Sequence, residues 1–169
     1  MCRLTPETEF VFPIHENLVP LGEPCKHLST FVHHYGYARK ECFDEKDTRT
    51  SRNLPLLLEM YEKDPDSPRC CMQIAQEYRS VSEFGPAVEY CRRGLGLARK
   101  EKQIYNYELW LQVHLPLLIF YTGDLRLALD EGERILKHPR TLEAAALHLS
   151  VTLVAVCRGL KEYKKGLKY

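Results

Sequence analysis

The stretch "SEFGPAVEYCRRGL" at residues 82–95 decides the fold, because its pattern recurs twice along the chain. "GDLRLALDEGERIL" (123–136) and "KEYKKGLKY" (161–169) also place a large apolar residue three positions before a small one. The three pairs are Phe84 and Ala87, Leu125 and Ala128, and Tyr163 and Gly166. A small side chain one turn after a bulky one lets a neighbouring helix approach closely. Each copy follows an apolar helix and a short turn, so the predicted unit is a helix hairpin.

The sequence around these copies has helical periodicity. Apolar residues recur at spacings of three and four from residue 54 onward, which is typical of amphipathic helices. Asn53 is predicted to cap the first helix, with Pro55 in its first turn, and "DPDSP" (64–68) is predicted to end it. Further helices are predicted over about 71–78, 84–98, 104–121, 125–137 and 142–157, with a last one starting near Leu160.

The repeated hairpin resembles the tetratricopeptide repeat. Its characteristic positions correspond to Ala75, Tyr78, Ala87 and Leu95 in the first copy, to Pro116 and Ile119 in the second, and to Val154, Cys157 and Gly166 in the third. The copies lie 41 and 38 residues apart, more than the ~34 of the standard repeat, so longer helices or wider turns are expected. The resemblance implies a mainly α fold over residues 48–169, a solenoid of about three helix hairpins with the last one truncated.

The inner face of such a solenoid is the usual recognition surface, and a partner protein or peptide would bind there. In the register of the repeats, this partner groove is formed by Arg69, Met72, Gln76, Arg79, Trp110, Val113, Leu117 and Phe120. The alternative is that the aromatic residues among them belong to the core. The basic run at 91–102 is interpreted as a solvated helix face.

Residues 1–47 have a different pattern. "FVFPI" (10–14) and "LSTFVHHY" (28–35) are rich in β-branched and aromatic residues and predict two short strands, joined by a loop over 15–27. Two strands alone do not make a stable sheet in water. This segment therefore needs partners that the chain does not obviously supply.

Three motifs in order, "IHE" (14–16), "HHYGY" (33–37) and "KDTRTSRNLPLLLEMYEKDPDSPR" (46–69), resemble the carboxyl end of a bacterial family 2 glycosyltransferase. The resemblance implies that residues 1–47 are a strand-containing remnant that closes an α/β catalytic domain, whose upstream part is missing here. The intact parent would transfer a sugar from a nucleotide diphosphate donor, with a divalent metal neutralising the leaving diphosphate. The isolated chain would hold no metal and would be inactive.

The resemblance also assigns roles to three residues. His34 would lie near the metal and the donor diphosphate, and His15 and Glu16 would act as a base or as a clamp on a sugar hydroxyl. The alternatives are a packed strand histidine and an exposed polar pair at a strand end.

The alternative function is a stand-alone repeat scaffold that binds a peptide or partner protein, with residues 1–47 as a cap. The formal net charge of +1 gives no reason to expect nucleic acid binding. The longest apolar run, 109–121, is shorter than the ~20 residues of a membrane span. The seven cysteines form no disulfide framework, and Cys91 and Cys157 fall on apolar helix faces, so a reducing cytoplasm is expected.

Overall fold

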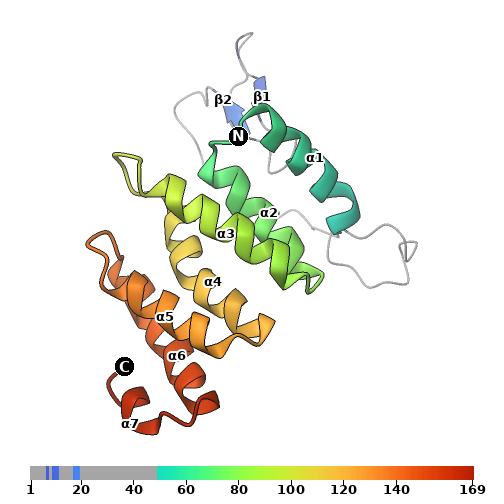
Figure 1. The fold of residues 1–169 in the computed structure, drawn as a ribbon. Coiled ribbons are helices and arrows are strands. Elements are labelled where there is room, and N and C mark those ends of the chain that lie inside the picture. The colour runs from blue at the N-terminus through green and yellow to red at the C-terminus, as the bar shows by residue number, and fades with distance from the viewer. Residues whose placement is uncertain (1–6, 8, 12–16, 20–48) are drawn as a thin grey trace, which may run out of the picture. The chain divides into compact units, whose positions relative to one another are not determined.

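The protein is mainly α in the part of the chain that the computed structural model describes, which is residues 7, 9–11, 17–19 and 49–169. The chain divides into two units, residues 1–56 and 57–169. The helices, shown in Figure 1, are α1 (Arg49–Lys63), α2 (Pro68–Ser80), α3 (Phe84–Ala98), α4 (Asn106–Thr122), α5 (Leu125–Leu136), α6 (Glu143–Gly159) and α7 (Tyr163–Gly166). The predicted α fold is thus confirmed.

The first unit contains a short antiparallel strand pair. β1 (Glu9–Val11) pairs with β2 (Asn17–Val19), and Phe10 lies opposite Leu18. β1 overlaps the strand predicted over 10–14, whereas β2 lies inside the predicted loop over 15–27, so that part of the prediction is wrong. Pro20 and Gly22, which suggested the loop, follow this strand in the sequence. The strand predicted over 28–35 lies outside the described residues.

Helix α1 begins earlier than predicted. It starts at Arg49, so Asn53 lies inside the helix and is not its cap, and Pro55 is an interior residue. The run from Arg49 to Asn53 contains no Gly or Pro, and nothing local stops the helix from extending upstream. The turn predicted after α1 is present, but Ser67 caps α2, its hydroxyl accepting a hydrogen bond from the backbone N–H of Cys70.

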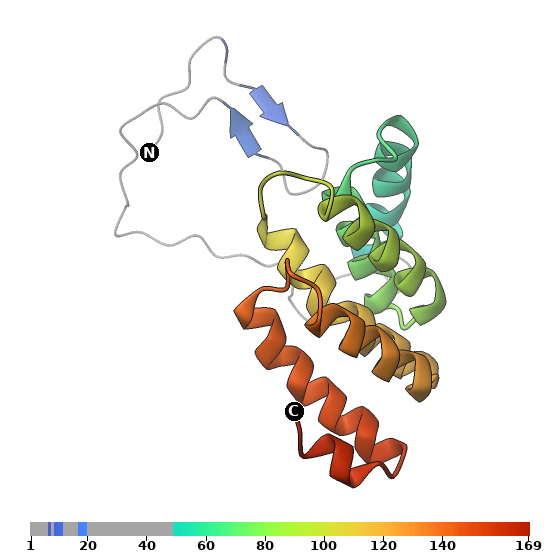
Figure 2. The ribbon, with the colours of Figure 1, turned by 60° about the vertical axis from the view of Figure 1, so that its left-hand side comes forward.

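In the second unit, helices that follow one another in the chain pack side by side and run back and forth (Figures 1 and 2). In addition, α2 contacts α4, and α4 contacts α6. The helices α2, α4 and α6 therefore lie in a row. Helix α3 connects α2 to α4, and α5 connects α4 to α6. The helix bounds agree with the predicted ranges to within a few residues.

Three of the turns share one backbone feature. Ser82, Gly123 and Lys161 each have a positive φ, at 63°, 90° and 62°, and they join α2 to α3, α4 to α5 and α6 to α7. They lie 41 and 38 residues apart, the spacing of the sequence motif. The left-handed Lys161 also explains why α7 begins at Tyr163 and not near Leu160, because a continuous helix cannot pass through it.

Small residues bring the helices of this unit together. Ala87 and Ala128 of the sequence motif are fully buried, as the large-then-small pattern predicted. A Cβ on Gly132 would lie 2.5 Å from Cδ2 of Leu153, and a Cβ on Gly94 would lie 2.9 Å from the Cβ of Cys71. These helix pairs therefore pack with no room for an added methyl group.

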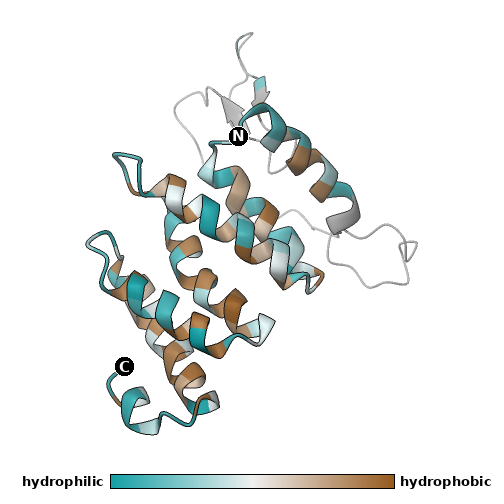
Figure 3. Cartoon of the chain, in the orientation of Figure 1, coloured by the Kyte–Doolittle hydropathy of each residue, from teal (hydrophilic) through white to brown (hydrophobic). Residues whose placement is uncertain are grey.

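The helices α4 and α6 are apolar over most of their surface, as the brown colouring in Figure 3 shows. No helix in the described part of the chain combines the length and the apolar character that crossing a membrane requires. Among the residues that the structure describes, four cysteines are buried free thiols: Cys70, Cys71, Cys91 and Cys157. Burial raises the pKa of Cys70 to about 11, so this thiol stays protonated and packs as a small apolar group.

Candidate functional site: a face across α2, α4 and α6

The predicted groove residues of α2 lie on its less buried side. Arg79 is exposed, and the other three are partly exposed: Arg69, Met72 and Gln76. The opposite side of the helix holds the fully buried Ile74 and Ala75. The apolar side of α2 is buried, and the opposite side therefore faces the surface.

The predicted groove residues of α4 are all partly buried: Trp110, Val113, Leu117 and Phe120. They lie opposite a fully buried set, Leu111, Leu115 and Leu118. Of the eight groove residues, Met72, Trp110 and Phe120 also pack against the core. These three residues therefore belong in part to the core, which was the alternative to a role in the groove. Val113 and Leu117 form the more accessible apolar surface of the helix.

His114 lies on the same side of α4, and the sequence prediction missed it. Its ring stacks on Trp110 with the centroids 4.0 Å apart and the planes 9° from parallel. Its Nδ1 lies 2.9 Å from the carbonyl oxygen of Trp110. Desolvation, with smaller contributions from the positive charges of Arg79 and His148, lowers the pKa of His114 to about 4. The imidazole is therefore neutral at pH 7.

These interactions bring three helices to one face. Arg79 comes from α2, His114 from α4 and His148 from α6, and the first and last are close enough to act on the second through charge. Beside them lie the apolar Val113 and Leu117 of α4. We name these five residues the inner face. It combines apolar surface with hydrogen-bond donors that are positively charged or neutral. The spacing of Trp110 and His114, four residues apart on a helix, was the available sequence signal.

A buried ion pair outside this face supports it. Arg140 Nη2 lies 2.6 Å from Oε2 of Glu108, whose side chain is almost fully buried. Gln112 Nε2 donates to Glu108 at 3.2 Å and to the Arg140 carbonyl at 2.9 Å. The Arg140 guanidinium also donates to the backbone carbonyls of Ala98, Glu101 and Gln103. The network joins the α3–α4 connection to the α5–α6 connection and fixes where α4 and α6 begin.

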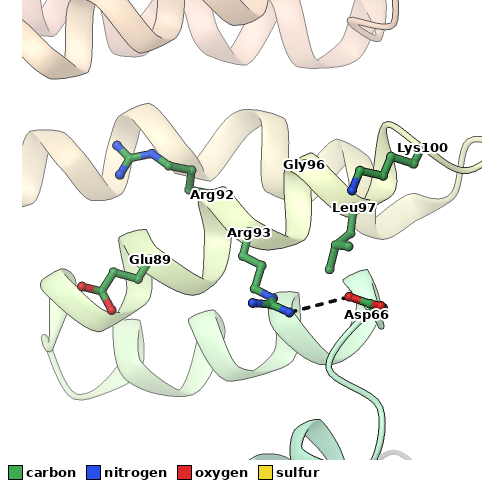
Figure 4. A pocket seen from close by; sticks show the side chains of 7 residues that line it. All are labelled: Asp66, Glu89, Arg92, Arg93, Gly96, Leu97 and Lys100. Atoms are coloured by element: carbon green, nitrogen blue, oxygen red, sulfur yellow. Dashed lines mark ion pairs between the residues drawn. The ribbon is translucent and has the colours of Figure 1, made fainter.

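The basic run at 91–102 lines a surface hollow of about 610 Å³ (Figure 4). Arg93 Nη2 lies 3.6 Å from Oδ1 of Asp66, and Arg92 points away, with its Nε 3.6 Å from Oε1 of Glu131. Both arginines and Lys100 are exposed, as the prediction of a solvated helix face requires, whereas Arg99 of the same run is partly buried. Carboxylates already lie beside the two arginines, so the hollow offers little uncompensated charge to a ligand.

The residues that the glycosyltransferase resemblance singled out, His15, Glu16 and His34, lie outside the described residues. Within residues 49–169 and the short strands, no three His, Cys, Asp or Glu side chains come together as metal ligands would. The sequence matches no protein-family model and no curated protein.

Proposed function

We propose that α2 to α7 form a tetratricopeptide-like solenoid whose inner face binds a segment of a partner protein. The observation that carries the proposal is the row of α2, α4 and α6, which presents Arg79, His114 and His148 beside an apolar strip. The shared left-handed turns, at the motif spacing of 41 and 38 residues, support an origin in repeated hairpins. The wider spacing than in the standard repeat goes with long helices, since α4 and α6 have 17 residues each.

The chemistry of the face defines the segment that fits it. Val113 and Leu117 offer apolar contact, and Arg79 offers a bidentate donor that suits a carboxylate. A carboxylate beside His114 would also favour the protonated imidazole and return its pKa toward the ordinary value. The expected ligand is therefore a short peptide segment with aliphatic side chains next to an acidic residue.

Trp110 provides the test, because it is the only tryptophan of the chain and its ring stacks on His114 of the inner face. Peptides selected from a random display library against the whole chain are titrated while tryptophan fluorescence is followed. We expect selected peptides to carry aliphatic and acidic residues and to shift the Trp110 emission. Leu117→Arg should weaken binding about tenfold, since it places charge in an apolar contact.

The matched control is Ile104→Arg, which changes an exposed apolar residue in the α3–α4 connection. Selected peptides that bind both variants as tightly as the unchanged protein would show that the inner face is not the binding surface. Arg79→Gln separates the two contributions, since it should lower affinity for acidic peptides and leave neutral ones unchanged.

The motif order supports a second proposal, that the repeats serve a family 2 glycosyltransferase and bind its acceptor or an assembly partner. The observation that favours it is His-Tyr-Gly-Tyr at 34–37 followed by "RNLPLL" at 52–57. In the intact enzyme, His34 would approach the metal and donor diphosphate, and His15 and Glu16 would contact the acceptor. The isolated chain would keep the binding activity of the repeats without catalysis.

The size of the native product separates the two proposals. An antibody against residues 82–136 is used for immunoblotting of source cells. A band much heavier than 19.7 kDa supports the enzyme, and a sugar-transfer assay on that product with His34→Ala, and His33→Ala as the neighbouring control, tests the residue role. A band at 19.7 kDa favours the stand-alone scaffold.

A further inference from the structure

The outward side of α6 carries an apolar stripe with a charge at each end. Five exposed residues form this stripe, which we name the α6 stripe: Glu143, Leu147, Val151, Val154 and Arg158. Their spacings of four, four, three and four residues keep them on one side of the helix. Leu147 and Val151 are each 70% exposed and Val154 is 44% exposed. A surface helix ordinarily has polar residues there, so the stripe has the composition of a contact surface.

One position of the stripe, that of Val154, is buried in both earlier hairpins. Val154 follows Pro116 and Ala75 at the repeat spacing of 38 and 41 residues, and both of those are buried. Leu167, directly after α7, is 88% exposed, whereas Leu129, at the same position of the hairpin before, is fully buried. Helix α2 contacts α4, and α4 contacts α6, so each earlier hairpin has a further helix of the chain beside it. Val154 therefore occupies a position that is buried elsewhere in this molecule and is exposed on α6.

The charges at the ends of the stripe specify which helix fits. Glu143 stands in the first turn of α6 and Arg158 in the last. Neither has an ion-pair partner among the residues described here. Read from either end, the stripe is a charge, three aliphatic residues and the opposite charge. A helix that pairs with it should present a basic residue opposite Glu143 and an acidic one opposite Arg158, which α6 itself does when it is reversed.

We propose that two copies of this chain associate through the α6 stripe, with the two α6 helices antiparallel about a two-fold axis near Val151. Glu143 of each copy then faces Arg158 of the other, Leu147 faces Val154, and the two Val151 side chains meet. A parallel pair would oppose like charges at both ends, so the antiparallel arrangement is favoured. One helix per copy makes a contact at the small end of the interface size range, and a reversible dimer follows.

Sedimentation equilibrium of the full chain over a wide concentration range tests the proposal. We expect the unchanged protein to dimerise reversibly and Val151→Arg to raise the dissociation constant by more than about tenfold, because two arginines would meet on the axis. Ile104→Arg, at an exposed apolar residue away from the stripe, is the matched control and should dimerise unchanged. Thermal melts of both variants verify that they fold.

A charge exchange tests the orientation. Glu143→Arg alone and Arg158→Glu alone should each raise the dissociation constant about tenfold, since each opposes like charges at two symmetric places. The double variant Glu143→Arg, Arg158→Glu should recover the original constant, because the pairs are attractive again. An unchanged protein that stays monomeric at every concentration, a Val151→Arg dimer of normal strength, or a double variant without recovery would each overturn the proposal. The first result would assign the stripe to another helix or protein.

Discussion

The helices α4 and α6 have nearly the same design but different surroundings. Each has 17 residues, is apolar over most of its surface and has a glutamate in its first turn. Helix α4 contacts α2, α3, α5 and α6, whereas α6 contacts α4, α5 and α7 within the described residues. The outward residues of α4 are consequently half-buried, and those of α6 are exposed. The comparison teaches that neighbours, and not the composition of an apolar helix, decide which of its faces reaches solvent.

The largest expected difference concerns the two first-turn glutamates. Glu108→Ala should lower the free energy of unfolding by about 3–5 kcal/mol. The substitution removes the carboxylate and leaves the partly buried Arg140 guanidinium without this ion-pair partner. Glu143→Ala, at an exposed site, should change it by less than about 0.5 kcal/mol. Urea unfolding in dilute solution measures both. Similar losses for the two variants would mean that the buried network does not distinguish the helices.

Leucine truncation compares the covered and open faces directly. Leu115→Ala in α4 removes a fully buried side chain and should cost about 2–5 kcal/mol through lost burial and a cavity. Leu147→Ala in α6 removes a side chain that is 70% exposed and should cost less than about 0.5 kcal/mol. The same urea experiment applies. A large loss at Leu147 in dilute solution would show that the outward face of α6 is covered within the single chain.

The histidines of the two helices should differ in their effect on acid stability. The folded-state pKa of His114 is depressed from 6.5 to about 4, so its neutral form contributes fully above pH 6.5, and the contribution is lost as pH falls toward 4. On acidification, the free energy of unfolding of His114→Gln should fall by about 2 kcal/mol less than that of the unchanged protein. The comparison is between unfolding free energies at pH 7.5 and pH 4.5. His148→Gln should reduce the acid destabilisation by a smaller amount, because it removes only one of the charges that act on His114.

The smallest expected effect comes from a glycine under α6. Gly132→Ala would bring a Cβ within 2.5 Å of the buried Leu153, and the crowding should outweigh the gain in helix propensity by about 1 kcal/mol. Gly96→Ala in α3 meets nothing within 4 Å and should stabilise by about 0.5–1 kcal/mol. Thermal unfolding gives both signs. A stabilising Gly132→Ala would show that α5 and α6 have room to separate.

Local patterns explain what the sequence could predict. Helix periodicity and the large-then-small pairs such as Phe84 and Ala87 depend on residues one turn apart, and the helices they predict are present. The interactions that were missed join distant residues. Glu108 and Arg140 are 32 residues apart, and His114 owes its depressed pKa to burial and to side chains on two other helices. No local rule identifies such partners.

The open face of α6 was missed for a related reason. Periodicity places Leu147 and Val151 on an apolar side, and in most helices that side is buried. Only the arrangement of α5, α6 and α7 reveals that this side has no neighbour among the described residues. The strand β2 shows a similar limit, since its pairing with β1 outweighs the turn composition that follows it. The motif register assigns each predicted groove residue to a position on a helix, and the role of these positions in binding stays a prediction.

The contact pattern of the second unit has a consequence for how it folds. Each described helix from α2 to α7 contacts only helices one or two places away in the chain. Such contacts close short loops, so little chain entropy is lost before each is made, and rapid folding is expected. Because no contact joins the two ends of this row, structural damage near α7 should leave α2 and α3 intact. Cooperativity in this molecule should therefore decay along the chain.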